Sequence, residues 1–136
     1  MSKSLGNTLL LSASEEAIHR AVSAMYTDPH HLKVTDPGQI DGNIVFTYLD
    51  AFHPNKAKVA EMKANYQQGG LGDKTCKNEL EVCLQELIAP MRERRATYIQ
   101  DKGMLMALLQ KGSERAHDVT QKTVREVKYG LGLPVF

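Results

Sequence analysis

The chain has 136 residues, a length that suits one compact domain with a modest hydrophobic core. Its formal net charge of +1 gives no bulk attraction to nucleic acid, so any RNA contact must come from a local patch. No apolar run approaches the roughly 20 residues that a bilayer-spanning helix needs, and the start has no signal-peptide pattern. We therefore expect a soluble, cytoplasmic protein without a membrane partner.

A short apolar connector at residues 8–11 precedes the first predicted helix. Ser12 and Glu15 have the Ser-x-x-Glu spacing of a capping box, so a helix should begin here. It should end near Tyr26, because Asp28 precedes a proline and that position disfavours helical backbone. The residues expected on its buried face are Ile18, Ala21, Val22 and Met25.

Two further helices are expected after a loop at residues 30–42, which is rich in glycine and in turn-forming aspartate and proline. Asn43 can cap a helix that runs to about Phe52, and Pro54 should stop it. The density of its apolar residues predicts a central place in the core. A third helix is expected over residues 55–68. Its inward-facing residues should be Val59, Met62 and Tyr66.

A turn at Gly69-Gly70-Leu71-Gly72 should separate the third helix from a long fourth one. No strand precedes this turn, so it lacks the context of a phosphate-binding glycine loop. Asp73 should cap the fourth helix, which should continue to about Gln100 with a kink at Pro90. Its apolar residues, continued by the more polar Arg94 and Tyr98, alternate at intervals of four and three, as in helix bundles. They are Cys76, Leu80, Cys83, Leu87, Met91, Arg94 and Tyr98.

The last predicted helix begins after Asp101, which can cap it, and ends at Gly130. Gly112 is expected to weaken or bend it. Its apolar residues are Met104, Leu105, Leu108, Leu109, Ala116, Val119, Val124 and Val127. Because we find neither strand patterns nor internal repeats, the predicted fold class is all-α, a helical bundle.

The two cysteines, Cys76 and Cys83, would lie about 10.5 Å apart along one helix, which is too far for a disulfide. We expect buried thiols in a reducing compartment. The pair His117-Asp118 is typical of some metal phosphohydrolases, but the other histidines show no supporting spacing. No metal site is predicted.

The first residues combine Ser2, Lys3 and Ser4 with Gly6, a set that could hold phosphate. Hydroxyls and a lysine are donors to phosphate oxygens, and the glycine lets the backbone bend. By composition alone the same run is more typical of a disordered N-terminus.

As a pattern, Met-Ser-Lys-Ser-Leu-Gly-Asn resembles the "KMSKS" signature of class I aminoacyl-tRNA synthetases without its first lysine. The rest of the chain resembles the C-terminal part of the tryptophanyl-tRNA synthetase family. The stretches that carry this resemblance are Met25-Tyr26-Thr27-Asp28-Pro29, Asp36-Pro37-Gly38-Gln39, Gly42-Asn43, Val45-Phe46-Thr47-Tyr48-Leu49-Asp50-Ala51-Phe52, Gly69-Gly70-Leu71-Gly72, Arg92-Glu93-Arg94-Arg95-Ala96 and Gly132-Leu133.

The resemblance implies a parent enzyme that activates tryptophan with ATP and Mg²⁺, charges tRNA(Trp) and forms homodimers. It implies that residues 1–12 are the ATP-binding loop and its connector, with Met1, Ser2, Lys3 and Ser4 at the nucleotide. Lys3 would be the catalytic group that stabilises the charge developing on phosphate. Residues 13–136 would form the helical anticodon-binding domain.

In this family a Rossmann half with a "HIGH" motif precedes the loop, and this sequence contains neither. We therefore expect a fragment that is inactive alone and binds no cofactor by itself. Two alternatives stay open: a free-standing helical RNA-binding or adaptor module, and the corresponding part of a tyrosyl-tRNA synthetase.

Four basic residues of the fourth helix are candidates for tRNA phosphate contacts: Arg92, Arg94, Arg95 and Lys77. The alternative is a solvated helix face on which the arginines pair with Glu86, Glu93 or nearby acids.

Overall fold

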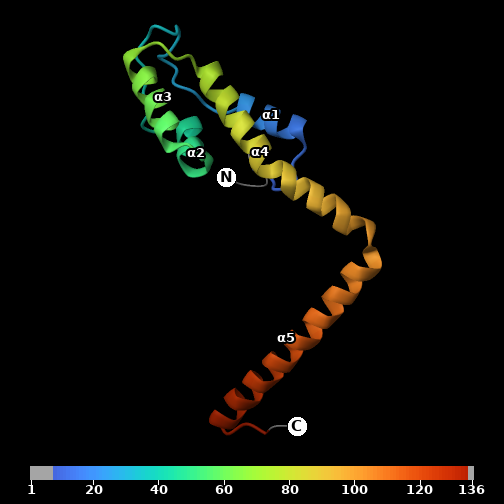
Figure 1. Cartoon of the computed structure of the whole chain (residues 1–136). Coiled ribbons are helices and arrows are strands. Elements are labelled where there is room, and N and C mark those ends of the chain that lie inside the picture. Colours follow the sequence, from blue (N-terminus) through green and yellow to red (C-terminus); the bar gives the residue numbers. More distant parts are fainter. Residues whose placement is uncertain (1–7, 135–136) are drawn as a thin grey trace. The chain divides into compact units, whose positions relative to one another are not determined.

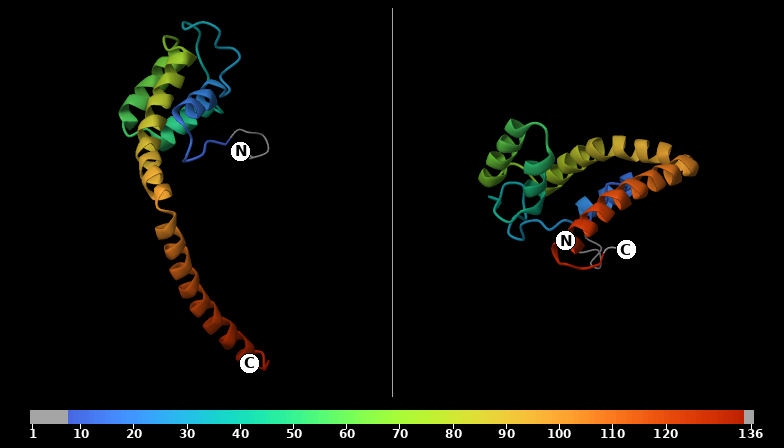
Figure 2. Two further views of the ribbon diagram at one scale, coloured as in Figure 1. Left: turned by 90° about the vertical axis from the view of Figure 1, so that its right-hand side faces the viewer. Right: turned by 90° about the horizontal axis from the view of Figure 1, so that it is seen from below.

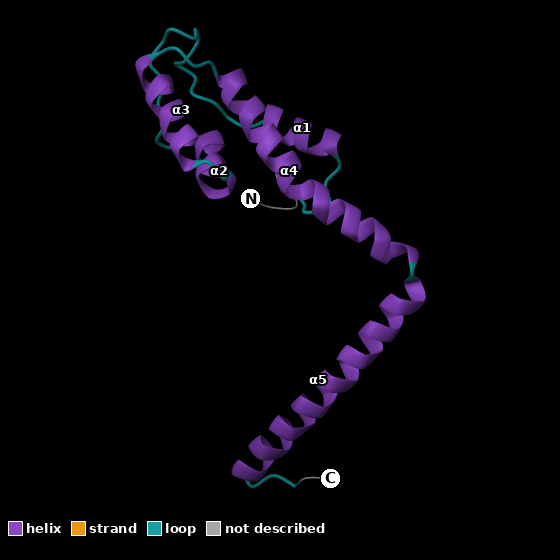
Figure 3. Ribbon diagram, viewed as in Figure 1, coloured by secondary structure: helices purple, strands orange, loops and turns teal. Residues whose placement is uncertain are grey.

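Helices make up all the regular structure that the computed structural model describes, which covers residues 8–134 (Figures 1 and 3). The helices are α1 (Glu15–Ser23), α2 (Ile44–Phe52), α3 (Lys56–Gln68), α4 (Asp73–Gln100) and α5 (Lys102–Gly130). No strand occurs in this part of the chain, so the all-α prediction is confirmed. No helix within it combines the length and the apolar character that a bilayer crossing needs.

The chain divides into two structural units, Met1–Arg94 and Arg95–Phe136. This boundary falls inside α4 and differs from the division at residues 12 and 13 that the resemblance implies, which stays a prediction. In the first unit, α1, α2 and α3 gather around the first part of α4 (Figure 2).

One apolar cluster holds the first unit together, and α1, α2, α3 and α4 all contribute to it. Its largest fully buried side chains are Tyr66, Phe46, Ile18, Leu49, Leu80, Leu84 and Ile88. The residues predicted to face inward from α3, namely Val59, Met62 and Tyr66, are all buried. Removing these apolar surfaces from water is the main driving force for folding.

The start of α1 differs from the prediction. Ser14 is the capping residue, and its hydroxyl accepts a hydrogen bond from the backbone N–H of Ala17 (3.2 Å). The prediction of a capping box that starts at Ser12 is therefore wrong, because Glu15 is the first residue of the helix and a capping box needs it to be the third. The helix also ends at Ser23, before the predicted Tyr26.

The caps predicted for two other helices are confirmed. The side chain of Asn43 accepts a hydrogen bond from Val45 N–H at the start of α2 (3.0 Å), and Asp101 accepts one from Met104 N–H at the start of α5 (2.8 Å). Asp73 is instead the first helical residue of α4, so it does not precede the helix as a cap would.

The buried face of α4 follows a different register from the predicted one. Its buried residues are Cys76, Leu80, Cys83, Leu84 and Ile88. Leu87 and Met91 are only half-buried, and Arg94 and Tyr98 are exposed, so the predicted alternation of four and three does not follow the buried face beyond Cys83. A row at intervals of four is the ridge by which helices pack at larger crossing angles, whereas alternation of four and three belongs to near-parallel coiled coils.

Both cysteines are free thiols and buried, as predicted. Burial raises the pKa of the Cys76 thiol to about 12, and burial also raises that of Cys83. Both groups therefore act as small apolar core residues.

The register of α4 can be tested by two identical truncations. Leu84→Ala should lower the free energy of unfolding by about 2–5 kcal/mol, because it empties a fully buried position. Leu87→Ala should cost less than about 1.5 kcal/mol, because the side chain is already partly in water. Urea unfolding followed by circular dichroism measures both, and a cost for Leu87→Ala that equals or exceeds that for Leu84→Ala would contradict the structure.

Candidate functional site

The loop between α1 and α2 is anchored on Tyr66 of α3. The tyrosine ring is fully buried and lies 4.5 Å from the ring of His31 and 5.1 Å from that of Phe46, measured between centroids. Its hydroxyl donates a hydrogen bond to the carboxylate of Asp73 (2.8 Å). Burial raises the pKa of Tyr66 well above its usual range, and Asp73 raises it further, so the hydroxyl stays a neutral donor.

Two glycines allow the loop to approach this anchor closely. The N–H of Gly38 donates to the Tyr66 carbonyl (2.9 Å), and a Cβ at Gly38 would come within 2.1 Å of the Tyr66 ring. Gly69, at the end of α3, has a φ of 79°, and a Cβ there would meet the carbonyl oxygen of Thr35 at 2.3 Å. Larger residues at either position would push the loop away from α3.

His31 joins the same network from the loop side. Its Nδ1 lies 2.9 Å from Oδ2 of Asp73, and its side chain is almost completely buried. Its Nε2 is buried without a hydrogen-bond partner in the described part of the chain.

Beside this anchor the two ends of the loop meet and enclose a hollow of about 190 Å³. It is lined by Tyr26, Asp28, Pro29, Gln39, Asp41, Gly42 and Asn43. Asp28 joins the two ends, because one carboxylate oxygen accepts the N–H of His30 and the other accepts the N–H of Gln39, each at 2.9 Å. These two backbone hydrogen bonds lower the pKa of Asp28.

The hollow offers a specific set of groups to a ligand. Both carboxylate oxygens of Asp28 already accept backbone hydrogen bonds within the loop. The side chains of Tyr26, which is 61% exposed, and of Asp41 are instead open to solvent. An aromatic ring beside an amide (Gln39) and a carboxylate suits a flat heterocycle that carries N–H donors.

The sequence does not reveal this site. Two turn sequences, Asp28-Pro29 and Asp36-Pro37-Gly38, indicate a loop, but their linear order does not show that its ends meet. The pattern predicts that Tyr26 ends a helix, whereas α1 stops at Ser23 and Tyr26 lies in the loop. Nothing in the pattern distinguishes Asp41 from an ordinary turn residue.

Two of the basic residues predicted to contact phosphate hold α1 against α4. Arg92 donates hydrogen bonds to the Ala13 carbonyl and to the carboxylate of Glu15, both at 3.1 Å. Lys77 donates to the carbonyl of Ser23 at the other end of α1 (2.8 Å). The acidic partner of Arg92 is therefore Glu15 of α1.

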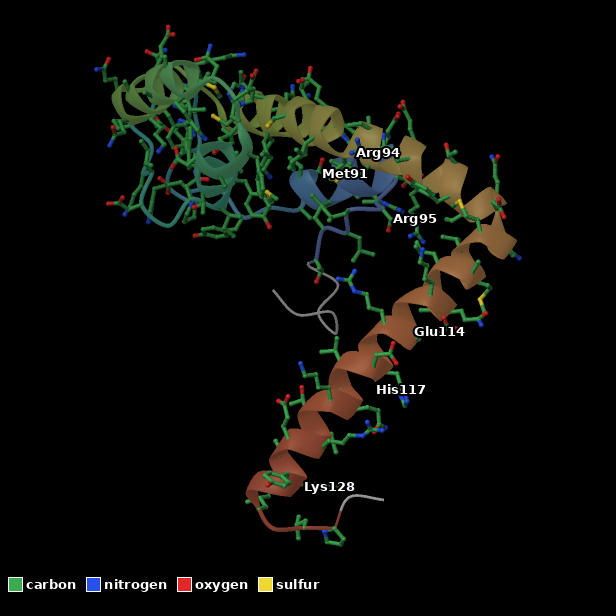
Figure 4. The ribbon with its side chains drawn as sticks, turned by 60° about the horizontal axis from the view of Figure 1, so that its bottom comes forward. Met91, Arg94, Arg95, Glu114, His117 and Lys128 are labelled. Carbon is green, nitrogen blue, oxygen red and sulfur yellow. The ribbon has the colours of Figure 1, made fainter. Side chains whose placement is uncertain are left out.

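Arg94 and Arg95 follow along α4, and both are exposed (Figure 4). Met1, Ser2, Lys3 and Ser4 lie outside the described residues. His117 and Asp118 line an open hollow on α5. No group of three or more His, Cys, Asp or Glu side chains in residues 8–134 could hold a metal ion.

A second polar cluster fixes the start of α3 to α4. Glu79 lies 2.9 Å from Nε2 of His53 and accepts a hydrogen bond from Lys58. The Lys58 ammonium, and then His53, lower the pKa of Glu79. The other ring nitrogen of His53 accepts the N–H of Asn55, which caps α3.

A comparison with protein-family models places residues 1–89 in the family described as tRNA synthetases class I (W and Y). This chain belongs to that family. The match includes the Tyr66 anchor and the hollow, whereas α5 lies beyond its last residue.

Relatives extend the similarity to the whole chain. It is 47% identical to a tryptophan–tRNA ligase of Streptococcus pyogenes and 45% identical to that of Clostridium longisporum, in both cases over all of this chain. It spans 41% and 40% of the length of these two relatives.

Among solved structures, the tryptophanyl-tRNA synthetase of Campylobacter jejuni, complexed with ADP and tryptophan, matches 98% of this chain and 41% of its own, with a TM-score of 0.79. At 23% identity this match shows a shared fold.

The lowered pKa of Glu79 predicts how the stability of the first unit depends on pH. A carboxylate with a folded-state pKa below 4.5 stabilises the fold above that pH, and the stabilisation is lost as the pH falls through the folded pKa. Glu79→Gln should lower stability at pH 7 by about 1 kcal/mol and should flatten the loss below about pH 5.

The control is Glu86→Gln, an exposed position on the same helix, which should keep the acid dependence of the unmodified chain. Urea unfolding at a series of pH values measures all three proteins. Parallel acid curves for the unmodified chain and Glu79→Gln would show that this cluster contributes nothing.

Proposed function

We propose that this chain works as the C-terminal part of a tryptophan–tRNA ligase, which activates tryptophan with ATP and Mg²⁺ and transfers it to tRNA(Trp). The observation that supports this most strongly is the similarity to tryptophan–tRNA ligases along the entire chain, at 47% identity to the S. pyogenes relative. Since the chain spans about two fifths of these relatives, the proposed activity belongs to a longer polypeptide.

In this proposal residues 1–12 supply the ATP-binding loop. Ser2 and Ser4 donate hydroxyl hydrogen bonds to phosphate, beside Met1, and Lys3 stabilises the negative charge that develops as the adenylate forms. The C. jejuni relative was solved with ADP and tryptophan, the classes of ligand that this reaction requires.

Residues 13–136 bind the anticodon arm of the tRNA in this proposal. The ring of Tyr26 stacks on one unpaired base, and Asp41 and Gln39 bond the N–H groups on its edge. The hollow of about 190 Å³ is small enough to select a single base. Exposed single-stranded loops are the parts of an RNA that proteins read in this way.

Phosphate contacts in this proposal come from Arg94 and Arg95. Arg92 and Lys77 contribute those N–H groups that do not already donate hydrogen bonds to α1 and the residues before it. We extend the proposal to a cytoplasmic homodimer for the longer enzyme. A free-standing RNA-binding module is not favoured, because the similarity to ligases runs from the first residue to the last. The named relatives also favour tryptophan over tyrosine.

The base-binding role of Tyr26 can be measured with a labelled tRNA(Trp) anticodon stem-loop. Tyr26→Ala should weaken binding by about 1–3 kcal/mol, the usual value for one stacked base. Tyr129→Ala removes an even more exposed tyrosine (85%) at the end of α5 and should have no effect. Equal affinity for matched and mismatched stem-loops, or no loss in Tyr26→Ala, would reject the base site.

The arginines should show a different signature in the same titration. Arg94→Gln and Arg95→Gln should each weaken binding to matched and mismatched stem-loops alike and reduce the slope of log affinity against log salt by about 1. Unchanged salt slopes in both variants would remove them from the interface.

The ATP loop predicts a negative result for the isolated chain. Tryptophan-dependent pyrophosphate exchange should stay at background, since a loop that must order itself without the rest of the enzyme bears the whole entropic cost. Exchange above background that disappears in Lys3→Ala would show that the chain is catalytic by itself.

A further inference from the structure

The backbone that leads into α1 is fixed to the first unit at several points. We term residues 8–13 the entry segment. Its Leu9 and Ala13 pack against the apolar cluster of the first unit. The N–H of Ala13 donates to the Leu10 carbonyl (2.9 Å), so the chain makes a turn before α1 begins. The entry segment therefore has a defined path over the helices.

Arg92 of α4 ties the end of the entry segment to the helices. Its Nη1 donates to the Ala13 carbonyl (3.1 Å) and lies 3.4 Å from Oε1 of Gln85. Its Nη2 donates to the carboxylate of Glu15 (3.1 Å). Gln85 in turn donates from its side chain to the Glu15 carbonyl (2.9 Å). Two side chains of α4 thus hold the junction between the entry segment and α1.

The guanidinium of Arg92 is largely committed to this junction. A planar fork of N–H donors can reach a backbone carbonyl, an amide oxygen and a carboxylate at the same time. The Arg92 side chain is 21% exposed, whereas Arg94 and Arg95 are exposed. Because Glu15 is 80% exposed, its ion pair with Arg92 adds little, and the bond to the Ala13 carbonyl is the important one.

The other side of the entry segment is loosely packed. A hollow of about 360 Å³ lies between this segment and α1. Its lining consists largely of small side chains, namely Thr8, Leu9, Leu10, Ala13, Ala17, Arg20, Ala21 and Ala24. Since side chains that do not fill a space cannot fix what borders it, the anchors at the end of the segment decide its position.

The position of Thr8 limits where Lys3 can lie. Lys3 stands five positions before Thr8 in the sequence, and five extended residues span at most about 18 Å. Lys3 is the residue proposed to stabilise the charge that develops on phosphate. A displacement of about 1 Å in a reacting group can cost about 100-fold in rate. A side chain that fixes the entry segment can therefore affect the chemistry without contacting the substrate.

We propose that Arg92 is a positioning residue of the ligase, which holds the entry segment so that Lys3 reaches the phosphates of ATP. In this role it acts through the backbone of Ala13 and contacts no substrate. The inference rests on the proposed function, because it takes residues 1–12 as the ATP-binding loop and its connector. It gives α4 a part in amino-acid activation in addition to tRNA binding.

The first test is a double-mutant cycle between Arg92 and Lys3 in a whole ligase. The protein is a hybrid in which this chain replaces the matched stretch of the S. pyogenes ligase. Arg92→Gln should lower kcat for tryptophan-dependent pyrophosphate exchange about 10-fold and leave KM for tryptophan unchanged. In the Lys3→Ala background the same change should cost less than about 2-fold, because no lysine remains to be positioned.

Two further variants of the hybrid separate charge from position. Lys74→Gln removes one positive charge from an exposed position of the same helix and should change kcat by less than about 2-fold. Arg92→Lys keeps a donor for the Ala13 carbonyl and should recover part of the lost rate. Because the assay contains no tRNA, the loss of a contact to tRNA phosphate cannot explain the result.

Equal losses from Arg92→Gln with and without Lys3 would overturn the proposal, since they would indicate a general structural effect. Full activity of the Arg92→Gln hybrid would overturn it as well. Full activity of the Lys3→Ala hybrid would reject the proposed ATP-binding loop itself. The proposed function and the further inference can therefore fail separately.

Hydrogen exchange in the 136-residue chain supplies a second test that needs no activity. In Arg92→Gln the Ala13 amide should exchange at least about 10-fold faster, because the carbonyl of the same residue has lost its donor. The amides of Leu80 and Leu84 in α4 should remain protected. Unchanged protection of the Ala13 amide would overturn the proposal, whatever the hybrid shows.

Discussion

The packing of the loop between α1 and α2 on Tyr66 is the contact on which the shape of the candidate site depends. The Tyr66 side chain of α3 packs in the core and donates a hydrogen bond to Asp73, the first residue of α4. Its ring also contacts the ring of His31 in the loop. Gly38 is required for this contact, because any side chain there would overlap the tyrosine ring. Since the ring is fully buried, it has no open space into which it could move.

This constraint explains how an irregular loop can present a defined site. The two ends of the loop are joined by Asp28 and held against α3 and α4, so the hollow beside Tyr26 is placed by rigid helices. Binding residues on loops fixed in this way lose little entropy when a ligand binds. In the same unit, Arg92 and Lys77 fasten the two ends of α1 to α4. Two basic residues that the sequence predicts to contact phosphate therefore also hold α1 in place.

The two units meet the requirement for buried apolar surface in different ways. The first has its own core, built from four helices. The second consists mostly of α5, which buries none of its residues.

Local chemistry in the sequence predicted most of the fold. Asn43, Asp101 and the glycine turn after α3 were predicted because each satisfies backbone groups within a few residues. The register of α4 was predicted wrongly beyond Cys83, since whether Leu84 or Leu87 is buried depends on the angle at which other helices cross it. The hollow beside Tyr26 could not be predicted, because it joins two separate stretches, residues 26–29 and 39–43, which the hydrogen bond from the N–H of Gln39 to Asp28 brings together.

Hydrogen exchange of the loop amides in Gly38→Ala tests the central role of the Tyr66 contact most directly. The account predicts that the N–H groups of His30 and Gln39 lose protection, because the loop leaves the tyrosine ring, whereas the amides of Leu80 and Leu84 in α4 remain protected. Loop amides that exchange as slowly in Gly38→Ala as in the unmodified chain would contradict it.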